Sequence, residues 1–154
     1  MVGLLHFADG EPFATGLAAC EIGPASPADP SARVLVRVAI EDVETRAVVD
    51  TAAPYVVCPP WLAQRINLSS ADSIDHIRLN IRGNSIPGHL HLLRVTFPAE
   101  EGVTHEVEAT VFVPDMIQPH AWGDLPAYIG LTGCLERMRF ALDPGSDDFY
   151  FGSL

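Results

Sequence analysis

Apolar and polar residues alternate along much of the chain with the period of two that is typical of β-strands. The clearest case is 33–40, where Val34, Val36, Val38 and Ile40 share one face. A polar segment, 41–45, separates this stretch from a second apolar run at 46–50, and together they predict a β-hairpin. Further strands are predicted at 13–22, 74–82, 86–97, 103–113, 139–142 and 149–152.

Few segments depart from this alternation. Helical spacing of apolar residues between Pro59 and Ser70 predicts a short helix after two prolines, and a second short helix is expected at 135–139. The prolines of 23–30 and 114–126 indicate loops, and Gly83-Asn84-Ser85 indicates a tight turn within a projecting hairpin. The pattern therefore predicts an all-β fold with one or two short helices.

Length and composition fit one globular domain. The chain has 154 residues, of which 48% are hydrophobic and 19% charged, and this length is sufficient to bury a core. We expect a single domain over 1–154, with an N-terminal strand and proline-rich loop at 1–30 and the core at 31–154.

The charge balance excludes some partners. A formal net charge of −11, with nine arginines and no lysine, disfavours nucleic acid and anionic membranes, which require a basic surface. The first sixteen residues lack the pattern of a signal peptide, and no apolar stretch is long enough to span a membrane. A cytoplasmic location is the expectation, and three widely spaced cysteines fit a reducing compartment.

One carboxylate stands out within an apolar run, Ala47-Val48-Val49-Asp50-Thr51-Ala52-Ala53. Aspartate is depleted from strands because its charge is costly to desolvate, so this position needs an explanation. Asp50 is either a turn residue that caps nearby amides, or a catalytic acid at the floor of a cleft.

Three segments together resemble the retropepsin-like aspartic peptidases. Val48-Val49-Asp50-Thr51-Ala52-Ala53 is similar to that family's apolar-apolar-Asp-Thr/Ser-Gly-Ala signature, and Tyr128-Ile129-Gly130-Leu131 is similar to its later hydrophobic-Gly motif. Between them, Arg82-Gly83-Asn84-Ser85-Ile86 stands where the tip of the family's flap hairpin lies. The resemblance implies a retropepsin-like closed barrel, with Ile129 and Gly130 packed behind the active-site loop of Asp50, Thr51, Ala52 and Ala53.

The resemblance also implies a mechanism and a partner. An aspartic dyad needs two carboxylates that share one proton, one acting as base and the other as acid. The sequence has one Asp-Thr site and no second copy, so Asp50 would have to meet Asp50 of a second chain in a homodimer. The implied substrate is a peptide or protein, with no cofactor and no metal.

Two departures from the family pattern keep other functions open. Ala52 stands where the family usually has glycine, and Pro54 with Tyr55 replaces the acidic pair of viral members. The alternative is a non-catalytic dimer of the same fold that binds a peptide or protein in the cleft. A third hypothesis is an unrelated β-barrel in which Asp50 only caps a turn.

The remaining candidate residues also have two interpretations each. His89 and His91 share one strand face and suit a metal, although no third ligand is evident, so exposed edge histidines are favoured. Cys58 and Cys134 are expected to be core thiols, and Trp122 either lines a pocket or simply packs. The aromatic terminal strand 149–151 is expected to be an edge near the subunit interface.

Overall fold

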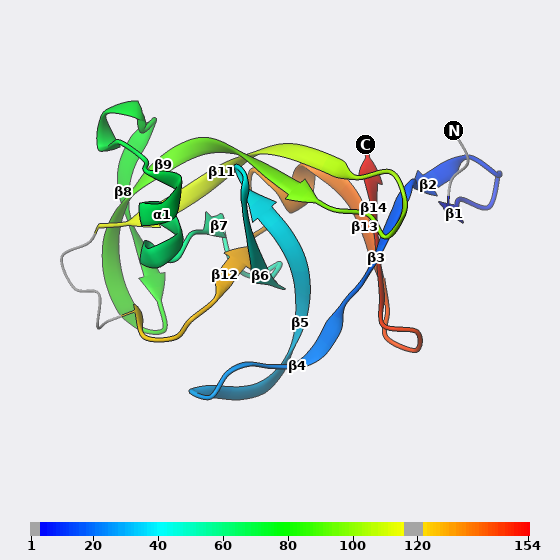
Figure 1. The fold of residues 1–154 in the computed structure, drawn as a ribbon, viewed down its shortest axis with the longest axis horizontal. Coiled ribbons are helices and arrows are strands. Elements are labelled where there is room, and N and C mark those ends of the chain that lie inside the picture. The colour runs from blue at the N-terminus through cyan, green and yellow to red at the C-terminus, as the bar shows by residue number, and fades with distance from the viewer. Residues whose placement is uncertain (1–3, 116–121) are drawn as a thin grey trace.

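The computed structural model describes residues 4–115 and 122–154, and β-strands dominate this part of the chain (Figure 1). The predicted all-β fold with few short helices is confirmed. The strands are β1 (Leu5–His6), β2 (Pro12–Ala14), β3 (Gly16–Ala19), β4 (Glu21–Ser26), β5 (Asp29–Ile40), β6 (Val43–Val49), β7 (Val56–Val57), β8 (Asp75–Ile81), β9 (Asn84–Phe97), β10 (Glu101–Gly102), β11 (His105–Pro114), β12 (Ala127–Ile129), β13 (Met138–Asp143) and β14 (Asp148–Ser153).

The largest sheet closes on itself. Its eight strands follow the order β4-β5-β6-β12-β7-β11-β9-β8, and β5 pairs additionally with β9 through Ala39 opposite Thr96 and Ile40 opposite Val95. This extra pairing joins the second strand of the order to the seventh, so the sheet forms a barrel without a free edge at that place.

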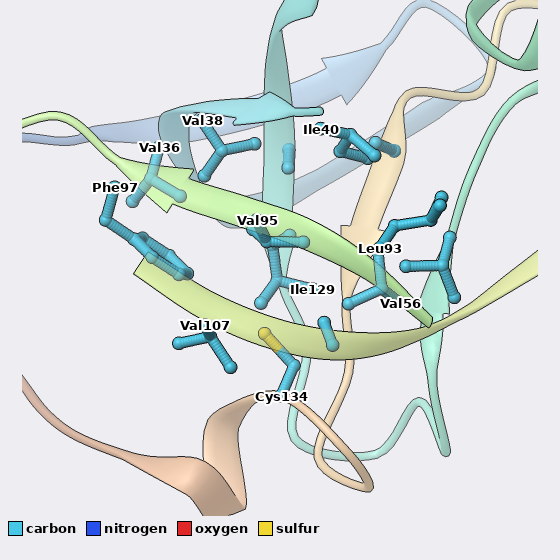
Figure 2. Packing of buried hydrophobic residues seen from close by; sticks show 14 of the residues in the cluster. Val36, Val38, Ile40, Val56, Leu93, Val95, Phe97, Val107, Ile129 and Cys134 are labelled. Carbon is cyan, nitrogen blue, oxygen red and sulfur yellow. The ribbon is translucent and has the colours of Figure 1, made fainter. Parts of the chain in front are cut away.

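The core lies inside this barrel. Figure 2 shows Val36, Val95, Phe97, Ile129 and Cys134 gathered in one buried cluster, although they come from segments far apart in the chain. The alternation along β5 explains this arrangement, because the face that carries Val36, Val38 and Ile40 is the buried face. The predicted hairpin of β5 and β6 is present, with Arg37 opposite Arg46.

A second sheet of order β10-β3-β14-β13 changes the expectation for the C-terminal strand. β14 pairs with β3 on one side and with β13 on the other, so it is not an edge strand. Phe149 and Phe151 are buried and pack against Phe97 of the main core. The aromatic character of 149–151 therefore reflects core packing within the chain.

The proline-rich segment 23–30 is not a loop, contrary to the prediction. β4 and the start of β5 pair across it, with Gly23 opposite Arg33 and Ser26 opposite Asp29. β4 lies at the edge of its sheet, where a proline removes no ladder hydrogen bond that a neighbour needs. The predicted strand 13–22 is likewise divided, into β2, β3 and the start of β4.

Helical structure is limited to short segments in the described residues. The predicted helix is α1 (Pro60–Ile66), which begins after Pro59 and ends at Asn67 in a left-handed conformation. Single turns of 3₁₀ helix occur at η1 (Ser70–Asp72) and η2 (Leu135–Arg137). Among the described residues, no helix has both the length and the apolar character needed to cross a membrane.

Candidate active site

Asp50 follows directly after β6 and begins a short loop. Its backbone N–H donates to the carbonyl oxygen of Ile129 at 3.0 Å, and its Oδ1 accepts a hydrogen bond from the N–H of Ala52 at 2.9 Å. The N–H of Ala53 donates to the carbonyl oxygen of Asp50 at 3.1 Å. Asp50 thus caps its own turn, as the first interpretation expects. The cap involves one carboxylate oxygen, so the second interpretation is still open.

The loop is clamped from behind by the segment that contains Gly130. β12 runs parallel to β6 and antiparallel to β7, and it therefore lies between the two strands that flank the loop. A Cβ on Gly130 would lie 2.1 Å from the carbonyl oxygen of Tyr55 and 2.7 Å from that of Ala53. Only glycine allows this approach.

Two backbone hydrogen bonds extend the clamp beyond Gly130. The N–H of Leu131 donates to the carbonyl oxygen of Ala53, and the N–H of Thr132 donates to that of Pro54, both at 2.8 Å. The loop is therefore held by backbone groups along its length, and its shape depends little on which side chains it carries.

Thr51 and Ala52 are exposed at the front of this loop. In the described residues, the non-glycine positions with positive φ are Glu41, Asn67, Arg82 and Asp147, so the methyl group of Ala52 causes no backbone strain. Alanine at position 52 is thus compatible with the local backbone.

The hairpin of β8 and β9 turns earlier than predicted. Ile81 is paired with Asn84, so Arg82 and Gly83 form a two-residue turn, with φ values of 50° and 79°. Positive φ at both positions is typical of the type I′ turn that suits hairpin twist. Asn84, Ser85 and Ile86 accordingly belong to β9, and the tip consists of Arg82 and Gly83.

One face of this hairpin covers a second apolar cluster, formed by Val57, Leu90, Phe112, Trp122 and Leu125. Ile77, Leu79, Ile81 and Ile86 of the hairpin pack against it, together with Tyr55 and Tyr128. The hairpin is therefore partly fixed in place by apolar contacts.

Trp122 contributes both to this packing and to a cavity. It is buried, and its Nε1–H donates to the carbonyl oxygen of Leu125 at 3.0 Å. It also lines a cavity of about 190 Å³ together with Arg82, Asn84 and Ile86 of the hairpin. Both interpretations of Trp122 are therefore correct, since it packs in the cluster and lines the cavity. Residues 116–121 of its predicted loop lie outside the described residues.

An ion pair joins the hairpin tip to the β4–β5 hairpin, and the two tips lie near each other in Figure 1. Arg82 Nη2 lies 3.4 Å from Asp29 Oδ2, and Arg33 Nη2 lies 3.0 Å from the same oxygen. Burial alone would raise the pKa of Asp29, but the hydrogen bond from Arg33 and further favourable contacts outweigh it, so the pKa is lowered.

The hydroxyl group of Tyr128 is affected by the charges of these groups and by that of Asp50. Burial raises the pKa of Tyr128, and the charges of Arg82, Asp29, Arg33 and Asp50 all act on its hydroxyl group. The charges of the tip ion pair and of Asp50 therefore act on the same tyrosine, which is paired with Val48 of β6 and Val57 of β7.

A second polar cluster, outside this site, was missed in the sequence. His89 and His91 are not exposed edge residues as predicted, because β9 lies between β8 and β11, and His91 is buried. His89 Nδ1 instead lies 3.0 Å from Asp115 Oδ1, and Asp115 Oδ2 lies 2.9 Å from Nε2 of His76. Burial alone would raise the pKa of Asp115, yet the hydrogen bonds with His76 and His89 outweigh it and lower that pKa. The signal was the hairpin register, which places His76 opposite His89.

The cysteines are free thiols within the fold. Cys58 and Cys134 are buried, and desolvation raises the pKa of each to about 12. Both thiols are therefore protonated at neutral pH and suit core packing better than nucleophilic catalysis.

Comparison with solved structures supports the fold. The chain is similar to a crystal structure of a retropepsin-like aspartic protease from Rickettsia conorii, with a TM-score of 0.50, 17% sequence identity, and coverage of 90% of this chain and 92% of that chain. No protein-family model matches the sequence, and no curated protein matches it. At this identity the likeness concerns the fold alone.

Proposed function

We propose that the chain is an aspartic peptidase that hydrolyses peptide bonds as a homodimer, with Asp50 of each protomer forming the dyad. The observation that carries the proposal is the presentation of Asp50. Its backbone is clamped by β12, Oδ1 is fixed by the N–H of Ala52, and the carboxylate lies on a loop whose next two residues are exposed. Two such carboxylates in contact would share one proton and activate a water molecule.

The surface around the loop supports a dimer through this region. Thr51 and Ala52 are exposed, and Leu131, whose N–H is bonded to Ala53, is a large apolar residue with 42% of its surface exposed. Contact between two copies of this loop would cover Leu131 and bring the Asp50 side chains together. The strand 149–151 is not proposed for the interface, because it is paired on both sides.

The test is Asp50→Asn, assayed for peptide cleavage at acidic and neutral pH. Asparagine keeps an oxygen that accepts the Ala52 hydrogen bond but cannot ionise, so the fold stays intact while kcat/KM falls by roughly 10²–10⁴-fold or more. Asp9→Asn is a matched control, because Asp9 Oδ1 accepts the N–H of Glu11 in the same kind of turn. Equal cleavage by the Asp50 variant and the wild type would refute the assignment.

Mixed dimers test the shared dyad separately. When wild type and Asp50→Asn are mixed in equal amounts and allowed to exchange, a shared dyad leaves about one quarter of the activity, because only wild-type pairs are active. A site complete within one chain would instead retain about half. Sedimentation that shows only monomer under the assay conditions would also contradict the shared dyad.

The second candidate function is a non-catalytic dimer that binds a peptide or protein in the cleft. The observation that favours it is the exposed methyl group of Ala52, which projects where the family has no side chain. Peptide binding without turnover, unaffected by Asp50→Asn, would support this function. Turnover that requires Asp50 and is blocked by a transition-state mimic of aspartic peptidases would exclude it.

A further inference from the structure

Three potential metal ligands meet at the base of the β8–β9 hairpin. His76 on β8 is directly opposite His89 on β9, and Asp115 directly follows β11, the strand that neighbours β9. One ligand atom from each of the three residues lies within 4.8 Å of the other two. This is the arrangement of donors around a single point that a bound ion requires.

We propose that His76, His89 and Asp115 form a binding site for a divalent transition-metal ion of the zinc class. Two imidazole nitrogens and one carboxylate oxygen are a donor set that suits Zn²⁺, and related ions such as Co²⁺ and Ni²⁺ take imidazole ligands as well. Three protein ligands leave at least one coordination position for water. The site shares no residue with the Asp50 loop, so it does not depend on the proposed peptidase function.

Binding would draw the donor atoms around one point. With metal–ligand bonds of about 2.0–2.1 Å, the donors of a tetrahedral site lie about 3.3 Å apart. In the structure one donor atom from each residue lies within 4.8 Å of the other two, and the carboxylate of Asp115 contacts His76 Nε2 through Oδ2 at 2.9 Å and His89 Nδ1 through Oδ1 at 3.0 Å. The side chain of His76 is 54% exposed and has room to shift toward the ion.

The other two ligands are more firmly positioned. The N–H of Asp115 donates to the carbonyl oxygen of Pro87 at 2.9 Å, and the side chains of Asp115 and His89 are mostly buried. The rings of His76 and His89 are adjacent, with centroids 4.3 Å apart. Metal binding through His76 Nε2 and His89 Nδ1 would place the proton of each neutral ring on its other nitrogen.

Space for additional ligands lies next to the cluster. His89 and Asp115 line a cavity of about 450 Å³, together with the polar residues Gln64, Asn67, Ser70 and His91. This volume accommodates one or more water molecules that complete the coordination of the ion. Ion binding would connect β8, β9 and the end of β11 and would therefore fasten the base of the hairpin.

The test uses the full chain without a histidine tag, stripped of metal with a chelator and then titrated with ZnCl₂ by calorimetry. We expect one ion per chain and, with CoCl₂, the visible absorption of a bound cobalt ion. At a zinc concentration about 100 times Kd, Tm should rise by roughly 5–10 °C, because the ion binds the folded state.

Variants locate the site. Loss of even an outer-shell partner weakens metal sites by roughly 10–100-fold, so His76→Asn and Asp115→Asn should each weaken binding by at least about 100-fold. His6→Asn, which changes another exposed histidine, should leave affinity and the Tm shift unchanged. Binding that these two ligand variants leave intact would overturn the proposal. Absence of binding, or binding lost with His91→Asn but kept with His76→Asn, would overturn it equally.

Discussion

The Asp50 loop and the β8–β9 hairpin are held in different ways. Backbone contacts clamp the loop. β12 pairs with both strands that flank it, Leu131 and Thr132 donate two hydrogen bonds to it, and a Cβ on Gly130 would overlap the carbonyl oxygens of Ala53 and Tyr55. Side chains hold the part of the hairpin that extends beyond the sheet. Its apolar face packs over Trp122, and Arg82 forms an ion pair with Asp29. At its base, His76 contacts Asp115.

The difference concerns how each region can move. Backbone contacts hold the loop in one geometry, which suits the proposed role of Asp50 as a catalytic carboxylate. The hairpin beyond Gly88 is held by side-chain contacts that are individually weak, which suits the proposal that it moves as a flap over the substrate. Substitutions in the loop should therefore affect the whole fold, whereas those in the hairpin should act locally.

The largest effect is expected for Gly130→Ala. The new Cβ would overlap the carbonyl oxygen of Tyr55, which belongs to the backbone and cannot rotate away. We expect a loss of about 3 kcal/mol or more in the free energy of unfolding, which lowers Tm by roughly 6–12 °C in a chain of this size. Calorimetry or thermal circular dichroism measures the change.

Gly23→Ala is the matched control for that substitution. Gly23 has negative or extended φ, and its Cβ would meet only the end of the Glu21 side chain, at 3.9 Å. Its Tm should stay close to that of the wild type. If Gly130→Ala were equally harmless, the loop would not be clamped as described.

A smaller and more local effect is expected for Gly88→Ala in β9. Its Cβ would come within 2.5 Å of both the Phe112 ring and the carbonyl oxygen of Val113, forcing β9 away from β11. We expect about 2 kcal/mol of destabilisation, or roughly 4–8 °C in Tm. Amide hydrogen exchange should accelerate most along the hairpin, and at Asp50, whose N–H is bonded to Ile129, by no more than the loss of global stability allows. Exchange that accelerates more at Asp50 than along the hairpin would contradict the separation of the two regions.

Much of the fold was predictable because its signals are local. The alternation along 33–50 and 74–97 identifies both hairpins, and the two prolines before α1 mark its start. The position of β14 was not predictable in this way, since its partners β3 and β13 depend on pairings distant in sequence. Proline in β4 was misleading because its effect depends on whether a strand is at an edge, which the sequence does not reveal.

The candidate site shows the same limit. The Asp50 motif and the Ile129-Gly130 motif are each readable, but the overlap that requires Gly130 appears only when both segments are placed in space. For the histidine cluster, the position of the β8–β9 turn decides which residue lies opposite His89. The predicted turn at 83–85 would have placed Leu79 opposite His89, and the turn at 82–83 places His76 there. Arginine with positive φ is an unusual turn residue, so the sequence favoured the later turn.

The smallest effect on stability is expected for Arg82→Gln, which should act on the tip of the β8–β9 hairpin alone. This change removes one of the two arginines that contact Asp29, and because Arg82 is 41% exposed we expect no measurable shift in Tm. The tip alone should open more often, with faster exchange at the Asn84 amide. Arg94→Gln is the control, since Arg94 is similarly exposed and pairs with Asp42 elsewhere.

Acid should reproduce the effect of Arg82→Gln in the wild type. The pKa of Asp29 determines the pH at which this happens. Burial raises this pKa, but the hydrogen bonds with Arg33 and Ser31 outweigh it and lower the pKa below its ordinary value of 3.8. Asp29 is therefore charged and able to pair with Arg82 above that value, and the pair with Arg82 is lost as pH falls through the lower, folded pKa. Protection at Asn84 should therefore be constant from neutral pH down to about pH 4, after correction for intrinsic exchange, and should decrease only below it. Asp29→Asn should abolish this acid transition; if the transition persists in that variant, Asp29 does not hold the tip closed.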